Sequence, residues 1–172
     1  DYHNVSAMAG FQYDLNDAQI IRLNYAFAQR APNPAELFSD GLHHSAARIE
    51  LGDLRIKSES SSKISASYEL SNEHWGLTIA PYFNAINDFV LLEPTEVEFT
   101  IRGAFPVWSY RQTNAELIGI DFSLYNNWTS KFRSNHKFSW VRGTDKENDI
   151  PLINIPAANM SNSVTYTHTN WK

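Results

Sequence analysis

Apolar and polar residues alternate along several long stretches of this chain. A period of two residues predicts a β-strand, because successive side chains of a strand point to opposite faces of its sheet. The apolar positions of the clearest strands are Ile21, Leu23, Tyr25 and Phe27; Ile64, Ala66, Tyr68 and Leu70; Trp75, Leu77, Ile79, Pro81, Phe83 and Ala85; Ile118, Ile120, Phe122 and Leu124; and Phe138 with Trp140. With a looser strand over residues 5–15 and a last strand from Met160, the pattern predicts about seven strands and an all-β fold.

One of these strands contains a proline. Pro81 has no N–H to donate to a neighbouring strand, so we expect an edge, a bulge or a local bend at this position.

The connections between the predicted strands alternate between short and long. The short ones cover residues 14–17, 71–74 and 126–129, and the long ones, which we expect to be irregular, cover residues 30–62, 93–106 and 143–158. In an up-and-down antiparallel sheet every second connection lies on the same side. Short turns on one side and long loops on the other are typical of transmembrane β-barrels.

Aromatic residues gather near both kinds of connection. Tyr13, Trp75, Trp128 and Phe132 lie near the short turns, and Phe27, Phe89, Trp108, Tyr110 and Trp140 lie near the long segments. Two belts of aromatic rings around an apolar band are favoured at the two surfaces of a bilayer. Alternation alone would suit a soluble barrel or sandwich with its apolar face inside equally well. The predicted strands, at about 12–20 residues, are longer than the usual 5 or 6 in globular proteins.

Composition excludes several classes of function. The chain has 14 Lys and Arg against 19 Asp and Glu, a net charge of -5, and no basic run, so nucleic acid is not an expected partner. No Cys is present, which removes disulfides, zinc–thiolate sites and Cys nucleophiles. No stretch approaches the roughly 20 apolar residues of a membrane helix. Motifs of hydrolases, metalloproteases and phosphate-binding loops are also missing, so we expect neither an enzyme nor a resident cofactor.

The longest connection, residues 30–62, carries the candidate binding residues. A loop of this length in a compact domain is usually functional or disordered. This one contains stiffening prolines and a cluster of possible ligands for a captured molecule: Glu36, Asp40, His43 and His44. Imidazole nitrogens suit zinc or iron, so His43 and His44 are the candidate metal ligands. Adjacent residues of an extended chain point in opposite directions, so each histidine would need partners from other loops; a solvated loop or structural hydrogen bonds are the alternatives.

The same loop resembles a known family. Residues 30–44 read Arg-Ala-Pro-Asn-Pro-Ala-Glu-Leu-Phe-Ser-Asp-Gly-Leu-His-His and are followed by Glu50-Leu51-Gly52-Asp53 and Ile56-Lys57-Ser58-Glu59-Ser60. The run is similar to an extracellular loop of TonB-dependent outer-membrane receptors, with Ser58 where the family usually has proline. Residues 110–121 resemble a Tyr-x-Asn, Ala, Gly-x-Glu strand of the family, with Asp121 in place of the glutamate. Residues 150–158 resemble its Pro-Leu-x-x-Ile-Pro-Pro entry into a strand.

This resemblance implies a fold and a function. Residues 1–172 would be one partial segment, about seven strands, of a transmembrane barrel of about 22 strands. The plug domain would precede Asp1 and the closing strands would follow Lys172. The whole protein would sit in the outer membrane in contact with lipid, capture a metal chelate, haem or similar nutrient with its long loops, and engage the TonB system through the absent plug. A secreted or periplasmic all-β binding module, for instance for carbohydrate, is the alternative.

Overall fold

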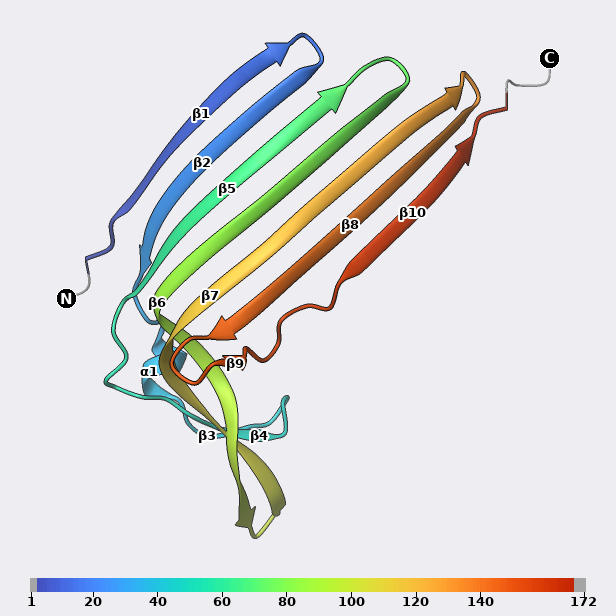
Figure 1. The fold of residues 1–172 in the computed structure, drawn as a ribbon. Helices are drawn as coiled ribbons and strands as arrows, with labels where there is room; N and C mark the ends of the chain where they lie inside the picture. Colours follow the sequence, from blue (N-terminus) through green and yellow to red (C-terminus); the bar gives the residue numbers. More distant parts are fainter. Residues whose placement is uncertain (1–2, 169–172) are drawn as a thin grey trace.

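Seven long strands form one antiparallel sheet in the computed structural model, which describes residues 3–168. In sheet order they are β1 (Ser6–Asn16), β2 (Gln19–Arg30), β5 (Glu59–Ser71), β6 (Trp75–Thr100), β7 (Gly103–Thr129), β8 (Phe132–Asp145) and β10 (Asn159–Tyr166). Figure 1 shows them side by side as a single curved layer. Within the described residues, β1 pairs only with β2 and β10 only with β8, so the sheet is open at both edges, as a partial barrel is. The predicted all-β, up-and-down architecture is confirmed.

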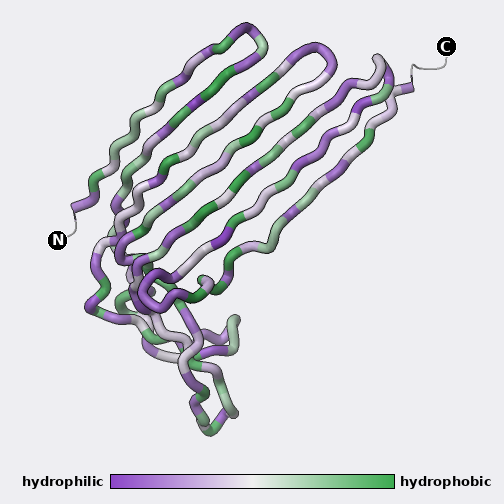
Figure 2. The backbone as a smooth tube through the Cα atoms, in the orientation of Figure 1, coloured by the Kyte–Doolittle hydropathy of each residue, from purple (hydrophilic) through white to green (hydrophobic). Residues whose placement is uncertain are grey.

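The register of the sheet brings the predicted apolar positions onto one face. Ile21 pairs with Tyr68, Tyr68 with Ile79, Ile79 with Phe122, and Phe122 with Phe138, which makes one row across five strands. Figure 2 shows the matching alternation of hydrophobic and hydrophilic residues along each strand. A soluble sandwich would cover this face with a second sheet. The described residues form no such second layer.

Pro81 lies inside the sheet, not at its edge. It belongs to β6, which is paired with β5 on one side and β7 on the other. The β5–β6 ladder has no pairs opposite Ala80 and Pro81, yet its register is the same before and after the gap. The missing N–H therefore interrupts the ladder without a bulge, and the expectation of an edge is wrong.

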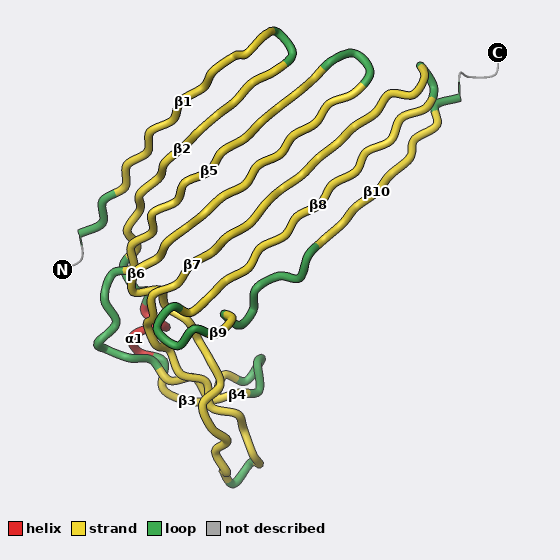
Figure 3. Tube along the Cα trace, in the orientation of Figure 1, coloured by secondary structure: helices red, strands yellow, loops and turns green. Residues whose placement is uncertain are grey.

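The short and long connections lie at opposite ends of the sheet, as predicted. Short turns at residues 17–18, 72–74 and 130–131 are at one end, the upper end in Figure 1. The strands thus run slightly further than expected, and β7 includes the predicted turn 126–129. The other end carries α1 (Pro34–Phe38), β3 (Asp40–His43), β4 (Arg48–Leu51) and β9 (Ile150–Pro151), so residues 30–62 are ordered there (Figure 3). No helix of residues 3–168 is long and apolar enough to cross a membrane.

The prediction of an irregular segment over residues 93–106 is wrong. Here β6 and β7 continue beyond the other strands as a two-stranded hairpin, which turns at Ile101 and Arg102 and is followed by Gly103 with φ +126°. The register shifts once, between Pro94 and Glu96, and the ladder then runs on to the tip. The prolines and glutamates concealed this alternation in the sequence. Val97 and Phe99, at two successive positions of one face, are 55% and 84% exposed.

Among residues 3–168, the buried apolar side chains lie at the long-loop end. Ile86, Leu91, Ala115 and Leu152 form a small cluster against which Phe89, Leu117 and Ile155 pack. The buried residues Ile49 and Val107 are paired at the junction of β4 and β7. Over the seven-strand part of the sheet the large apolar residues are half-buried or exposed. Within residues 3–168, the packed apolar core therefore lies under the long loops, and the seven-strand part of the sheet covers none.

Candidate ligand-binding site

The helix α1 is fixed at the mouth of the sheet by its own first turn. Asn33 caps it, because its side-chain oxygen accepts a hydrogen bond from the Glu36 N–H at 3.0 Å, and Glu36 accepts one from the Asn33 N–H at 2.8 Å. The buried Glu36 carboxylate also pairs with Arg30 at 2.9 Å, and Arg30 reaches Glu59 at 3.2 Å. The capping box and the ion pairs thus join the loop to the ends of β2 and β5.

The β3–β4 hairpin is held between α1 and the extended part of β7. The Gly52 N–H donates to the Ser39 carbonyl at 2.7 Å, and a Cβ at Gly52 would lie 2.7 Å from the backbone of Leu37. On its other edge, β4 forms a short parallel ladder with β7, in which Glu50 pairs with Trp108. Among the described residues this is the one parallel pair of strands in an otherwise antiparallel sheet. At Gly52, only glycine permits the backbone to approach that of Leu37 so closely.

A pocket of about 390 Å³ opens beside this hairpin, lined by Ala35, Ser39, Asp40, Gly41, Leu42, His43 and Glu50. The His43 side chain is 53% exposed, whereas that of Glu50 is 11% exposed. The two meet at 2.9 Å between Nδ1 and a carboxylate oxygen. Ser45 Oγ lies 3.0 Å from the other ring nitrogen, Nε2. Both nitrogens of His43 are therefore oriented by neighbours.

Glu50 remains ionised in this setting. Burial raises the pKa of its carboxyl, but hydrogen bonds from His43 and from Arg48 outweigh burial and hold the pKa below its usual range. The Arg48 Nε donates to Glu50 at 2.7 Å, and its guanidinium lies 4.7 Å from the centre of the Trp108 ring. A carboxylate can only accept, so neutral His43 donates from Nδ1 and keeps the lone pair on Nε2. That nitrogen can bind a cation once Ser45 turns away.

The structure brings two of the four predicted binding residues into this pocket. Asp40 and His43 line it, whereas Glu36 and His44 do not. Glu36 caps α1 and pairs with Arg30, and His44 is exposed in the β3–β4 turn. Among residues 3–168 no three His, Asp or Glu side chains are placed to hold a metal ion. The pocket offers a partial set of ligands.

Sequence reasoning missed the residues that orient His43. Glu50 entered the sequence analysis only as part of the family resemblance, and Ser45 was given no role. Trp108 is far away in sequence and reaches the hairpin through the parallel β4–β7 pairing. The alternation of Arg48 and Glu50 around a buried Ile49 is the one local signal of a short strand here.

Comparisons with known proteins agree with this architecture. The family model described as TonB dependent receptor-like, beta-barrel matches residues 1–172. A comparison with curated protein sequences finds no match. Among solved structures, the copper transporter OprC superposes with a TM-score of 0.79 at 19% identity, over 96% of this chain and 24% of that chain.

Two further receptors are similar in the same way. The siderophore receptor PirA from Acinetobacter baumannii gives a TM-score of 0.70 at 17% identity, over 96% of this chain and 27% of that one. The ferric enterobactin receptor PfeA from Pseudomonas aeruginosa gives 0.72 at 14% identity, over 96% and 26%. This chain thus spans about a quarter of the length of the solved structures it resembles. By the match over its whole length, the chain belongs to the TonB-dependent receptor β-barrel family.

Proposed function

We propose that residues 1–172 form part of the wall and the ligand-capturing loops of a TonB-dependent outer-membrane receptor. Family membership and the open edges at β1 and β10 support this proposal. An unpaired strand edge is unfavourable in a bilayer, so the neighbouring strands of a complete barrel would cover both. A plug domain outside these residues would close the lumen and contact TonB. The role of this segment is then to bind and conduct, not to catalyse.

The apolar face of the sheet is proposed to meet lipid, and the opposite face to line a wet lumen. In support, Ile64 and Ile118 are 51% and 49% exposed on the apolar face. The opposite face carries ion pairs and polar contacts, such as Arg22 with Glu69, and Ser139 with Asp121 at 2.5 Å. Alternation of this kind is typical of outer-membrane barrels, which have lipid outside and water inside.

A charge placed on the apolar face tests this orientation in the complete receptor. We expect Ile120→Arg to reduce membrane assembly strongly, because an arginine at the bilayer midplane costs about 2–4 kcal/mol. Asp121→Arg, one residue along on the polar face, is the matched control and should assemble. Receptor recovered in washed outer membranes is the measurement. Equal assembly of both variants would mean that the apolar face is not the lipid face.

The loop pocket is proposed to contribute to the capture of a transition-metal ion or a small chelate of one. The observation that carries this proposal is the hydrogen bond that His43 Nδ1 donates to the Glu50 carboxylate. Histidines that bind metals usually donate their second ring N–H to a carboxylate in this way. Asp40 lines the same pocket and supplies an oxygen ligand. The remaining ligands would come from other loops of the complete barrel or from the chelate itself.

His43 and His44 give a test with a built-in control, because only His43 lines the pocket. Cells would carry the complete receptor, and uptake of copper, zinc, a ferric siderophore and haem would be measured separately. We expect His43→Gln to lower the affinity for one of these ligands by at least about 10- to 100-fold, the range found when only a residue that orients a metal ligand is removed. His44→Gln should leave uptake unchanged. If His43→Gln takes up all four ligands normally, the pocket is not the capture site.

A further inference from the structure

An open groove lies on the apolar face of the sheet and crosses β5, β6, β7 and β8. It has a volume of about 480 Å³, and apolar side chains line it, among them Ile64, Ala66, Pro81, Phe83, Ile118 and Trp140. This is the face proposed to meet lipid. Nothing in the capture of a nutrient by the long loops uses the groove.

Small side chains form the floor of this groove. The register of β5 and β6, which is the same before and after the gap in their ladder, places Ala66 opposite Pro81. Pairs of larger side chains flank this pair on both sides: Ile64 and Phe83 toward the long loops, and Tyr68 and Ile79 toward the short turns. A methyl group and a pyrrolidine ring between larger side chains leave a depression in which a hydrocarbon chain can lie.

A cation lies beside the groove on its long-loop side. Arg142 pairs with Ile118 in the register of β7 and β8, and it follows Trp140 at the next position on the same face of β8. Directly opposite side chains of an antiparallel pair are about 5 Å apart at Cβ, so Arg142 is a neighbour of two residues that line the groove. An arginine stem can cover apolar surface while its guanidinium reaches polar groups.

Arg142 has no anionic partner in the part of the chain that the structure describes. Its side chain is exposed and forms no ion pair within residues 3–168. Glu116, the position after Ile118 on this face toward the long loops, is paired with Lys146 at 3.2 Å. These charged groups mark the end of the apolar band. A tryptophan next to such a boundary, as Trp140 is here, is typical of the headgroup level of a bilayer.

We propose that the groove and Arg142 bind a phosphorylated lipid of the outer leaflet, with an acyl chain over Ala66 and Pro81 and a headgroup phosphate on the guanidinium. The long loops of outer-membrane barrels lie on the extracellular side, which places Arg142 at that leaflet. A phosphate accepts charge-assisted hydrogen bonds from both prongs of a guanidinium. Lipid A, a phosphorylated lipid with several acyl chains, fits both parts. The inference rests on the proposed function, because the groove meets lipid only if the apolar face is the outer one.

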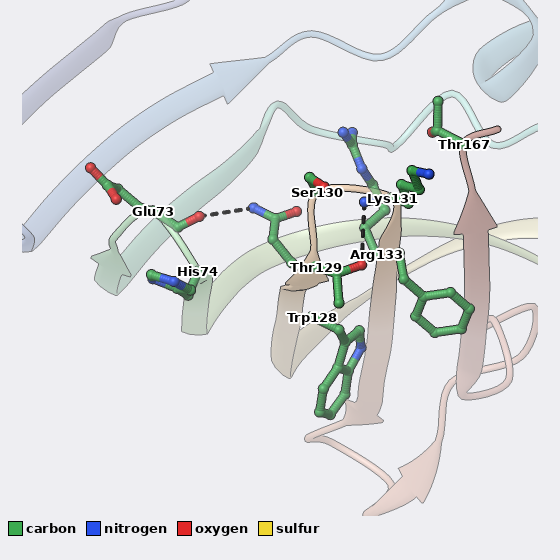
Figure 4. A pocket seen from close by; sticks show the side chains of 10 residues that line it. Glu73, His74, Trp128, Thr129, Ser130, Lys131, Arg133 and Thr167 are labelled. Carbon is green, nitrogen blue, oxygen red and sulfur yellow. Dashed lines mark hydrogen bonds between the residues drawn. The ribbon is translucent and has the colours of Figure 1, made fainter. Parts of the chain in front are cut away.

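A second exposed arginine of β8 provides a matched control. Arg133 lies on the polar face at the short-turn end, where it lines a pocket of about 370 Å³ together with Lys131 and Trp128. In Figure 4 the Arg133 side chain points away from the Trp128 ring, whereas Arg142 shares the face of Trp140. Arg133→Gln therefore removes the same charge from the same strand, but not from the proposed lipid face.

The test uses the complete receptor in a neutral detergent, with lipid A and fully dephosphorylated lipid A as separate probes. Bound lipid is titrated and counted by native mass spectrometry. We expect Arg142→Gln to weaken the binding of lipid A about tenfold and to leave the dephosphorylated lipid unaffected, because charge-assisted hydrogen bonds are lost. Arg142→Lys keeps the charge but not the two-pronged geometry and should fall in between. Arg133→Gln should bind both probes like the unsubstituted receptor.

The groove itself is tested by a variant that fills it. Ala66→Phe adds a ring to the floor without a change of charge and should weaken the binding of both probes. Ala9→Phe makes the same change on the apolar face of β1, where Ala9 pairs with Tyr25, and should weaken neither.

Three outcomes would overturn the proposal. Equal loss in Arg142→Gln and Arg133→Gln would mean that the lipid senses only the net charge. Equally tight binding of the two probes would exclude the phosphate contact. A receptor that assembles in the membrane but binds neither probe would exclude the groove and leave the proposed function intact, since Ile120→Arg and Asp121→Arg test the lipid face separately.

Discussion

Three arginines at the long-loop end of the sheet and two cations at the short-turn end differ in their pairing. At the long-loop end, Arg30, Arg48 and Arg111 each pair with at least one carboxylate. At the short-turn end, Lys131 and Arg133 pair with none among the described residues. The first end also contains the small apolar core, whereas the second is exposed. Paired charges fix the shape of a binding loop, and unpaired charges remain available for an outside partner.

The tightest part of the long-loop end surrounds Asp145. Its side chain is 1% exposed, accepts hydrogen bonds from Thr113 at 2.5 Å and from Asn148 at 2.9 Å, and pairs with Arg111 at 2.9 Å. Arg111 also pairs with Glu93 at the base of the β6–β7 hairpin. Burial raises the pKa of Asp145, but these hydrogen bonds outweigh it and hold the pKa well below its usual range. One carboxylate thus joins the end of β8 to the extended hairpin.

Removal of this carboxylate should produce the largest effect. We expect Asp145→Ala to reduce the local stability of the loop after β8 by about 3 kcal/mol, because the buried Thr113 hydroxyl loses its hydrogen-bond acceptor and Arg111 keeps only Glu93 as a partner. Hydrogen exchange of the Glu147 and Asn148 amides, both of which donate to Asp145, measures this in the complete receptor. The amides of the short-turn end serve as the internal control. Unchanged exchange at residues 147–148 would show that the two ends do not differ in tightness.

The hydrogen bond that orients His43 should give a smaller, pH-dependent effect. The folded pKa of Glu50 lies below its ordinary value of 4.5, so the stabilisation is fully present above pH 4.5 and is lost as the pH falls through the folded pKa. Glu50→Gln should remove this pH dependence and cost about 1.5–3 kcal/mol at neutral pH, the range for hydrogen bonds to a charged group. Exchange of the β4 amides, corrected for intrinsic rates, reports both results. If the stability of the Glu50→Gln variant falls at acid pH as it does in the parent, Glu50 is not the titrating group.

The wall of the sheet was predictable from sequence for a physical reason. Strand side chains repeat every two residues, so Ile118, Ile120, Phe122 and Leu124 reveal their shared face without knowledge of any partner. The same logic failed over residues 93–106, because Pro94 and Pro106 resemble loop residues and a register shift breaks the period. In the structure, these residues of β6 and β7 pair with each other as a two-stranded hairpin, which the sequence pattern did not reveal.

The candidate site was only half predictable, because its geometry depends on distant pairing. His43 and Asp40 were predicted as ligands because imidazole and carboxylate groups commonly bind metal ions. The partners of His43 are set by the parallel contact of β4 with β7, which no local pattern encodes. Glu36 illustrates the opposite difficulty: its acidic character suggested a ligand, but its place three residues after Asn33 makes it a helix cap. A capping box is a local signal, so this role was readable from the sequence.

The smallest effect is expected where the two short turns touch. The Asn127 side chain donates to the Glu73 carbonyl at 3.1 Å, and this contact joins the β7–β8 turn to the β5–β6 turn. We expect Asn127→Ala to cost about 0.5 kcal/mol, because the bond is neutral and water replaces it at an exposed carbonyl. Exchange of the Asn127 amide, which donates to the His74 carbonyl at 2.6 Å, is the measurement. A loss comparable to that of Asp145→Ala would mean that the short-turn end is held as tightly as the loops, and the unpaired cations there would then lie on a rigid rim, not on a loosely held one.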